Sequence, residues 1–143
     1  MKFFYTLIFL ILTFQSAVTA QNYKQRFNEI DVKHYNLAIE LNDSTNRIQA
    51  SITISLKFKQ LVSEFQLDFV EKDSTGRGMN IESVLQNNDS VAFTHSNNKI
   101  TIQPNFVNTD SIFNFKIKYD GIPKDGLIIS ENLYGDIFFF AAN

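Results

Sequence analysis

The chain has 143 residues with a formal net charge of −2; 44% of the residues are hydrophobic and 20% are charged. This length suits one domain, which can bury roughly two thirds of its unfolded surface in a core. The mild acidity, without a basic stripe, excludes a nucleic-acid partner. The absence of cysteine excludes disulfide bonds and a cysteine nucleophile.

The first twenty residues have the three parts of a secretory signal. Lys2 supplies a positive charge, an apolar run spans residues 3–14, and Val18 and Ala20 are the small residues that a signal peptidase reads. The apolar run is shorter than the roughly 20 residues that span a bilayer, so cleavage after Ala20 is favoured over a retained membrane anchor. We therefore predict an exported protein, periplasmic or extracellular, with no membrane span after cleavage.

Residues 21–29 are expected to be a polar lead-in, and the domain itself to span residues 30–143. Apolar and polar residues alternate from residue 32 to 41 and again from residue 48 to 58. A period of two is typical of strands with one buried face. Because turn-forming residues 42–46 separate the two runs, they are predicted to form a β-hairpin.

Shorter runs with the same period follow at intervals of about ten residues. They predict strands at residues 65–69, 81–85, 91–94, 100–102, 113–119 and 137–140. Gly121, Pro123 and Gly126 are expected to end the strand that precedes them. Since no segment of useful length has helical spacing, the predicted fold class is all-β. We expect an antiparallel-rich β-sandwich or a saddle-like curved sheet of about eight strands.

The sequence offers no catalytic constellation. His34 and His95 are far apart on predicted strands and are expected to be surface or rim residues rather than metal ligands. Carboxylates such as Glu40, Asp68 and Glu71 could pair as acid and base, but on the outer face of a sheet they are usually solvated. No serine lies in a Gly-x-Ser-x-Gly motif. We therefore predict no catalytic residue and no metal site in this chain.

Gly76-Arg77-Gly78 is at best a fragment of a phosphate-binding loop. A dinucleotide fingerprint needs a third glycine three residues on, where this chain has Ile81, and a helix after it. The segment is predicted to be a flexible loop.

The end of the chain is unusually apolar. In a strand, Phe138 and Phe140 would lie on one face, and Ile137 and Phe139 on the other. Covering a phenylalanine is worth roughly 1.5–3 kcal/mol, so both faces favour a partner. Two interpretations remain open. This segment is either a central strand buried within the domain, or a strand that packs against another polypeptide and leaves an apolar surface without it.

Six short segments match the opening of one enzyme family, in the family's order. Residues 30–37 (IDVKHYNL) and 48–54 (IQASITI) resemble the D-V-x-H-Y-x-L and I-x-A-x-x-T-I strands of the aminopeptidase N family of zinc metallopeptidases. The other four are residues 65–69 (FQLDF), 119–123 (YDGIP), 126–128 (GLI) and 134–143 (YGDIFFFAAN). The resemblance covers nearly all of residues 30–143.

The resemblance implies the amino-terminal β domain of that family, which leans on a thermolysin-like catalytic domain and partly walls its active site. The parent enzyme would remove amino-terminal residues from peptides, with zinc held by an HExxH helix and a downstream glutamate. Neither that HExxH motif nor the family's Gly-x-Met-x-Asn strand occurs in this sequence.

The resemblance therefore implies a chain truncated before the catalytic domain and inactive alone, with no cofactor of its own. The missing catalytic domain would be its partner, through the tail from Ile137 to Phe140. The family's substrate-side loop falls near residues 141–143, so Asn143 is a candidate substrate-side residue in the parent enzyme only.

Two other functions remain open. The chain could be a stand-alone secreted β-sandwich binding module, which would need a closed surface. It could also be a small barrel that holds an apolar ligand among its phenylalanines.

Overall fold

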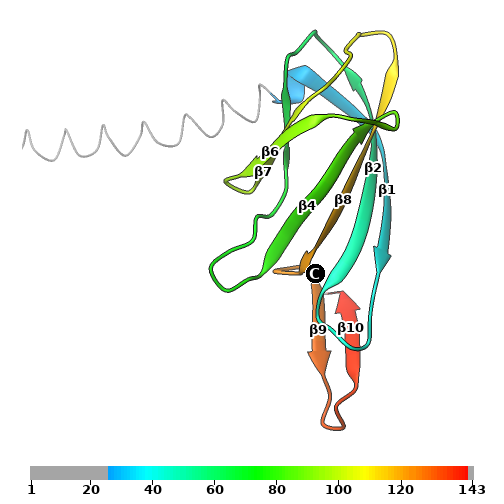
Figure 1. The fold of residues 1–143 in the computed structure, drawn as a ribbon. Coiled ribbons are helices and arrows are strands. Elements are labelled where there is room, and N and C mark those ends of the chain that lie inside the picture. The colour runs from blue at the N-terminus through cyan, green and yellow to red at the C-terminus, as the bar shows by residue number, and fades with distance from the viewer. Residues whose placement is uncertain (1–25, 142–143) are drawn as a thin grey trace, which may run out of the picture.

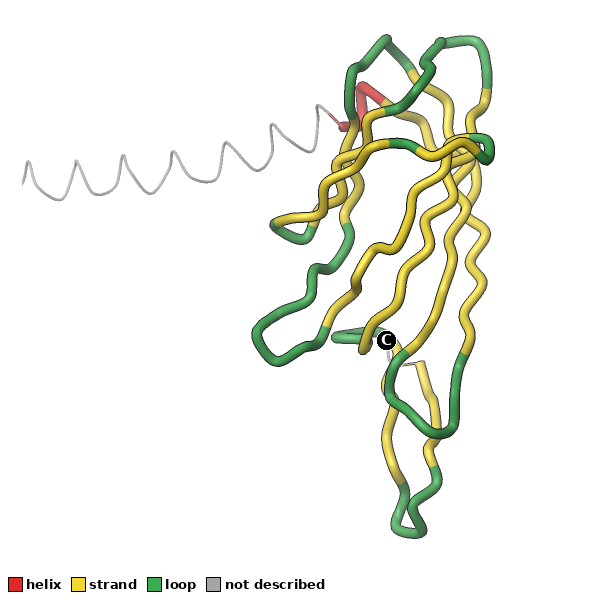
Figure 2. The backbone as a smooth tube through the Cα atoms, in the orientation of Figure 1, coloured by secondary structure: helices red, strands yellow, loops and turns green. Residues whose placement is uncertain are grey.

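A computed structural model describes residues 26–141 of the chain. These residues form a larger sheet, a smaller sheet that packs on it, and a separate two-stranded hairpin (Figures 1 and 2). A short helical turn at residues 26–29 lies within the expected polar lead-in. It is not long and apolar enough to cross a membrane, and neither is any other helix in the described part. The predicted signal at residues 1–20 lies outside the described residues.

The larger sheet has the strand order β1-β2-β8-β4-β5, and all its neighbours are antiparallel. Its strands are β1 (Ile30–Glu40), β2 (Ile48–Phe58), β8 (Ile112–Ile122), β4 (Gly78–Gln86) and β5 (Asp89–Ser90). Strands β1 and β2 pair along their whole length, from Ile30 opposite Phe58 to Glu40 opposite Gln49. The predicted hairpin is therefore confirmed.

The smaller sheet has the order β3-β7-β6 and is also antiparallel. Its strands are β3 (Phe65–Asp68), β7 (Lys99–Gln103) and β6 (Ala92–Ser96). Asn97 and Asn98 connect β6 to β7 with φ angles of 54° and 57°. Asparagine tolerates this left-handed conformation, which a two-residue hairpin turn of type I′ requires at both positions.

The core lies between the two sheets. Successive side chains of β2 and β8 point to opposite faces of the sheet, so every second side chain faces β3 and β7. The side chains on this inner face are apolar and form the core. The ring of Phe65 on β3 meets the ring of Phe115 on β8 edge to face, with centroids 5.0 Å apart, and Phe58 lies 5.5 Å from Phe65. The most deeply buried side chains are Leu56, Phe58, Phe65, Val84, Ile100, Ile102, Phe115 and Ile117.

One buried polar residue ties a loop to this core. The Gln86 side chain accepts a hydrogen bond from the Asn105 backbone N–H at 2.7 Å and donates one to the Phe106 carbonyl at 2.5 Å. A buried amide is stable only when it is bonded in this way. Gln86 therefore fixes the path of the chain between β7 and β8.

The all-β fold class is confirmed, with ten strands instead of about eight. The two-residue strand β5 and the strand β9 (Leu127–Glu131) were missed. β8 ends at Ile122, directly before Pro123, so the expected break lies at Pro123 and the strand continues through Gly121. A Cβ on Gly121 would lie 2.2 Å from the Gly78 carbonyl oxygen of β4, so this glycine permits a close approach of two strands rather than a break.

Candidate functional site

The two histidines do not form a site. His34 is an exposed residue on β1 of the larger sheet, whereas His95 lies on β6 of the smaller one. The Nε2 atom of His95 is 3.0 Å from the Phe69 carbonyl oxygen, and its ring meets the Phe69 ring edge to face. His95 thus has a local packing role, at the rim where the sequence places it.

The three carboxylates weighed as an acid–base pair lie in different parts of the fold. Glu40 ends β1 in the larger sheet, and Asp68 ends β3 in the smaller one, where it accepts a hydrogen bond from Arg26 at 2.7 Å. Glu71 forms an isolated bridge with Met79. Residues 26–141 contain no group of three or more His, Cys, Asp or Glu side chains that could hold a metal ion. The side chains of this part of the chain therefore do not fit a zinc site.

The Gly76-Arg77-Gly78 loop is anchored rather than loose. The Oδ1 atom of Asp73 accepts hydrogen bonds from the Thr75 N–H and hydroxyl at 2.9 and 2.6 Å, and from the Arg77 N–H at 3.2 Å. Lys124 lies 3.0 Å from the other oxygen. The hydrogen bond from the Thr75 hydroxyl, followed by that from Lys124, holds the pKa of Asp73 well below its ordinary value. These N–H groups are occupied by a carboxylate of the chain itself.

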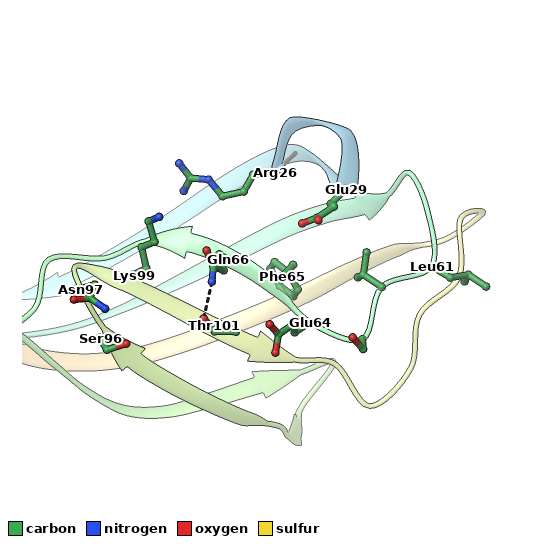
Figure 3. Close-up of a pocket in the computed structure, with 12 residues that line it drawn as sticks. Arg26, Glu29, Leu61, Glu64, Phe65, Gln66, Ser96, Asn97, Lys99 and Thr101 are labelled. Atoms are coloured by element: carbon green, nitrogen blue, oxygen red, sulfur yellow. Dashed lines mark hydrogen bonds between the residues drawn. The ribbon is translucent and has the colours of Figure 1, made fainter. Parts of the chain in front are cut away.

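A polar cleft of about 610 Å³ lies over the outer face of the smaller sheet (Figure 3). Gln66 and Thr101, joined by a hydrogen bond of 3.2 Å, form part of its floor. Glu29, Glu64 and Lys99 bring both signs of charge to it. Its lining is polar and open to solvent, as expected for the outer face of a surface sheet.

The apolar end of the chain forms a hairpin that projects beyond the larger sheet (Figure 1). Within the described residues, β10 (Ile137–Ala141) pairs only with β9, so the interpretation as a buried central strand is wrong. Phe138 and Phe140 are each 43% exposed, and their rings stack 5.7 Å apart. Both faces of the hairpin are largely apolar, since Phe139 lies opposite Ile129 and Phe140 opposite Ile128. This hairpin is the candidate interaction surface.

The substrate-side candidate Asn143, and Ala142 beside it, lie outside the described residues. The sheets do not close into a small barrel, because β1 and β5 are the two edges of an open five-stranded sheet. The buried rings of Phe58, Phe65, Phe113 and Phe115 fill the space between the sheets instead of lining a cavity.

Comparison with known proteins identifies the fold. No protein-family model and no curated protein matches the chain. Among solved structures, the M1 zinc metallopeptidase of Deinococcus radiodurans aligns with a TM-score of 0.57 and 16% identity, over 69% of this chain and 22% of that one. The chain shares its fold with part of the M1 zinc metallopeptidases. This agrees with the family that the six sequence segments resemble.

Two further structures support the shared fold. Native leukotriene A4 hydrolase of Saccharomyces cerevisiae aligns with a TM-score of 0.61 and 17% identity, over 80% of this chain and 19% of that one. A mutant of the Deinococcus radiodurans enzyme bound to a Tyr-Ser-Ala substrate aligns with a TM-score of 0.55 and 16% identity, over 72% and 22%. The chain thus spans only about a fifth of the length of the metallopeptidases that it matches.

Proposed function

We propose that this chain is the amino-terminal accessory domain of an exported zinc metallo-aminopeptidase. The observation that carries the proposal is the shared fold, which aligns most of this chain with about a fifth of each M1 enzyme. The order of the six sequence segments supports the amino-terminal position. The domain packs on a catalytic domain and forms part of the wall of its active site, and a peptide is the substrate of the complete enzyme.

The hairpin supports this role because its stability on its own would be low and its apolar surface is exposed. An isolated pair of strands is at best marginally stable in water, and a large exposed apolar surface is typical of an interaction site. β9 and β10 expose Ile128, Phe138 and Phe140 on one face. We assign this face to contact with the catalytic domain. Asn143 is the candidate substrate-side residue of the complete enzyme.

Zinc belongs to the catalytic domain in this proposal. Its ligands must be assembled in one place before the metal binds, and residues 26–141 supply no such group. The accessory domain therefore contributes position and shape, and it is inactive alone.

The test begins with the gene. Sequencing past the codon for Asn143 should reveal an open frame that later encodes an HExxH helix, and the complete protein should release amino-terminal residues from peptides in a chelator-sensitive way. In that protein, Phe138→Asp should lower kcat/KM or the yield of folded enzyme at least about tenfold, because it places a charge in a buried contact. Leu133→Asp at the fully exposed hairpin tip is the matched control and should have little effect.

A native product of this length that ends at Asn143 would overturn the proposal. A well-folded monomer that binds a ligand would then favour the stand-alone binding module. If the complete enzyme tolerated Phe138→Asp as well as Leu133→Asp, the enzyme assignment would stand but the contact through the hairpin would be wrong.

A further inference from the structure

Strand β1 is an edge of the larger sheet, and only its first part is protected against pairing with another strand. The register with β2 shifts between Val32 and His34, and the Lys33 ammonium lies 2.5 Å from the Asp31 carboxylate. A bulge and edge charges are two ways by which proteins block edge-to-edge association. From His34 to Glu40 the pairing with β2 is regular, without proline or glycine. Within residues 26–141 no strand pairs with the outer edge of this seven-residue stretch, so it is an open template for another strand.

The inner side of the same stretch is apolar and exposed. Tyr35, Leu37 and Ile39 are 56%, 52% and 44% exposed. They lie opposite Ile54, Ile52 and Ala50, so they share the face on which the core is built. The alternation of these three residues with polar ones predicts that they are buried. The smaller sheet, however, covers a different part of that face, formed by residues such as Leu56 and Phe115, and leaves these three exposed.

The outer side of the stretch ends in an imidazole at one end and a carboxylate at the other. His34 stands at one end and Glu40 at the other, both exposed on the face opposite the apolar row. An antiparallel copy centred on Leu37 would place Tyr35 opposite the second copy's Ile39, and His34 opposite its Glu40. A parallel copy in register would place like residues opposite each other instead. Apolar pairs stabilise directly opposed positions, and an imidazole N–H can donate a hydrogen bond to a carboxylate. Like charges, such as Glu40 opposite Glu40 in the parallel arrangement, destabilise them.

We propose that the chain forms a two-fold symmetric dimer through antiparallel pairing of β1 with β1 of a second copy, centred on Leu37. The contact joins two five-stranded sheets into one and pairs the free backbone groups of both edges. It also brings the two apolar rows side by side on one face. Such a contact is isologous, because the same residues serve both copies, and it closes at two subunits. It lies on a different surface from the hairpin and does not depend on a catalytic domain.

Sedimentation velocity of the complete mature protein over a range of micromolar concentrations tests the dimer. We expect a concentration-dependent dimer that Leu37→Lys converts to a monomer, since two lysines would meet on the symmetry axis. Leu133→Lys makes the same chemical change at an exposed position outside β1 and should leave the dimer intact. Far-UV circular dichroism shows whether each variant keeps its fold.

An exchange of the residues at positions 34 and 40 tests the register. His34→Glu should weaken the dimer about tenfold, because two pairs of carboxylates would then face each other. Combining His34→Glu with Glu40→His places an imidazole opposite each carboxylate again and should restore the dissociation constant. A chain that stays monomeric at all concentrations, a dimer that survives Leu37→Lys, or a double variant no tighter than the single one would each overturn the proposal.

Discussion

Gly121 is the residue at which β8 comes closest to β4. A Cβ at this position would lie 2.2 Å from the Gly78 carbonyl oxygen and 2.9 Å from the Met79 Cα, both backbone atoms that cannot turn aside. We predict that Gly121→Ala lowers the free energy of unfolding by about 2 kcal/mol, because the two strands must separate. Urea denaturation followed by circular dichroism measures the change.

Gly126→Ala is the comparison for that substitution. Gly126 has a φ of +79° but no atom within 4 Å of a Cβ, so alanine there meets only backbone strain of about 1 kcal/mol. Equal effects of the two substitutions would contradict the role assigned to the close approach of β8 and β4.

Asp73 makes the stability of the loop between β3 and β4 dependent on pH. Its pKa is lowered in the folded chain, first by the Thr75 hydroxyl and then by Lys124, from an ordinary value of 3.8. A lowered pKa adds stability that is fully present above the unfolded value and is lost as the pH falls below it. We predict that Asp73→Asn destabilises the chain at pH 6, and that the difference between the two proteins shrinks below about pH 4. A difference that stayed constant between pH 6 and pH 3 would contradict this assignment.

At the scale of elements, the β9–β10 hairpin should be the least stable part of the described chain. Its two strands pair with each other alone, whereas β2 and β8 have neighbours on both sides. Amides that open locally exchange with solvent faster than those that need global unfolding. We predict that hydrogen exchange in β10 is at least about a hundredfold faster than in β2 or β8 of the isolated chain. Similar protection in the hairpin and in β8 would show that this hairpin is supported by the chain itself.

At the scale of the whole molecule, a few aromatic rings join the two sheets. Phe65 of the smaller sheet contacts Phe58 and Phe115 of the larger one, and all three are at most 1% exposed. Phe65→Ala should cost about 4 kcal/mol, because it removes a buried ring and leaves a cavity. Phe106→Ala, at a position 61% exposed, should cost less than about 1 kcal/mol. Equal melting temperatures of the two variants in thermal unfolding would contradict this account.

The open edge, the half-covered inner face and the lone hairpin are all features of the whole molecule. In each of them the secondary structure is regular, but the rest of the described chain covers the apolar surface only in part. A domain that packs on a larger neighbour would have this character, since part of the apolar surface is completed by other polypeptide. The proposed accessory role and the proposed pairing of β1 are two ways to cover different parts of that surface.

The sequence by itself determined most of the strands, although it missed β5 and β9. Apolar and polar residues alternate along β1, β2 and β8, and side-chain direction in a strand has a period of two, so the strands and their apolar sides are local properties. The polar turn before Ile48 likewise predicted the first hairpin. The role of Gly121 could not be predicted, because a glycine has the same local signature whether it ends a strand or admits a neighbour; only the position of Gly78 decides between them.

Only the tertiary structure decided which apolar faces are covered. Leu37 and Leu56 have the same pattern around them, yet one is half exposed and the other fully buried, because the smaller sheet reaches only the second. The same holds for the candidate interaction surface: its apolar character is a local property, and its exposure is a tertiary one. The sequence predicted that the Ile137–Phe140 strand is apolar on both faces, and it left open whether the domain buries them. Burial depends on contacts between segments far apart in the chain, and local alternation does not record where those segments meet.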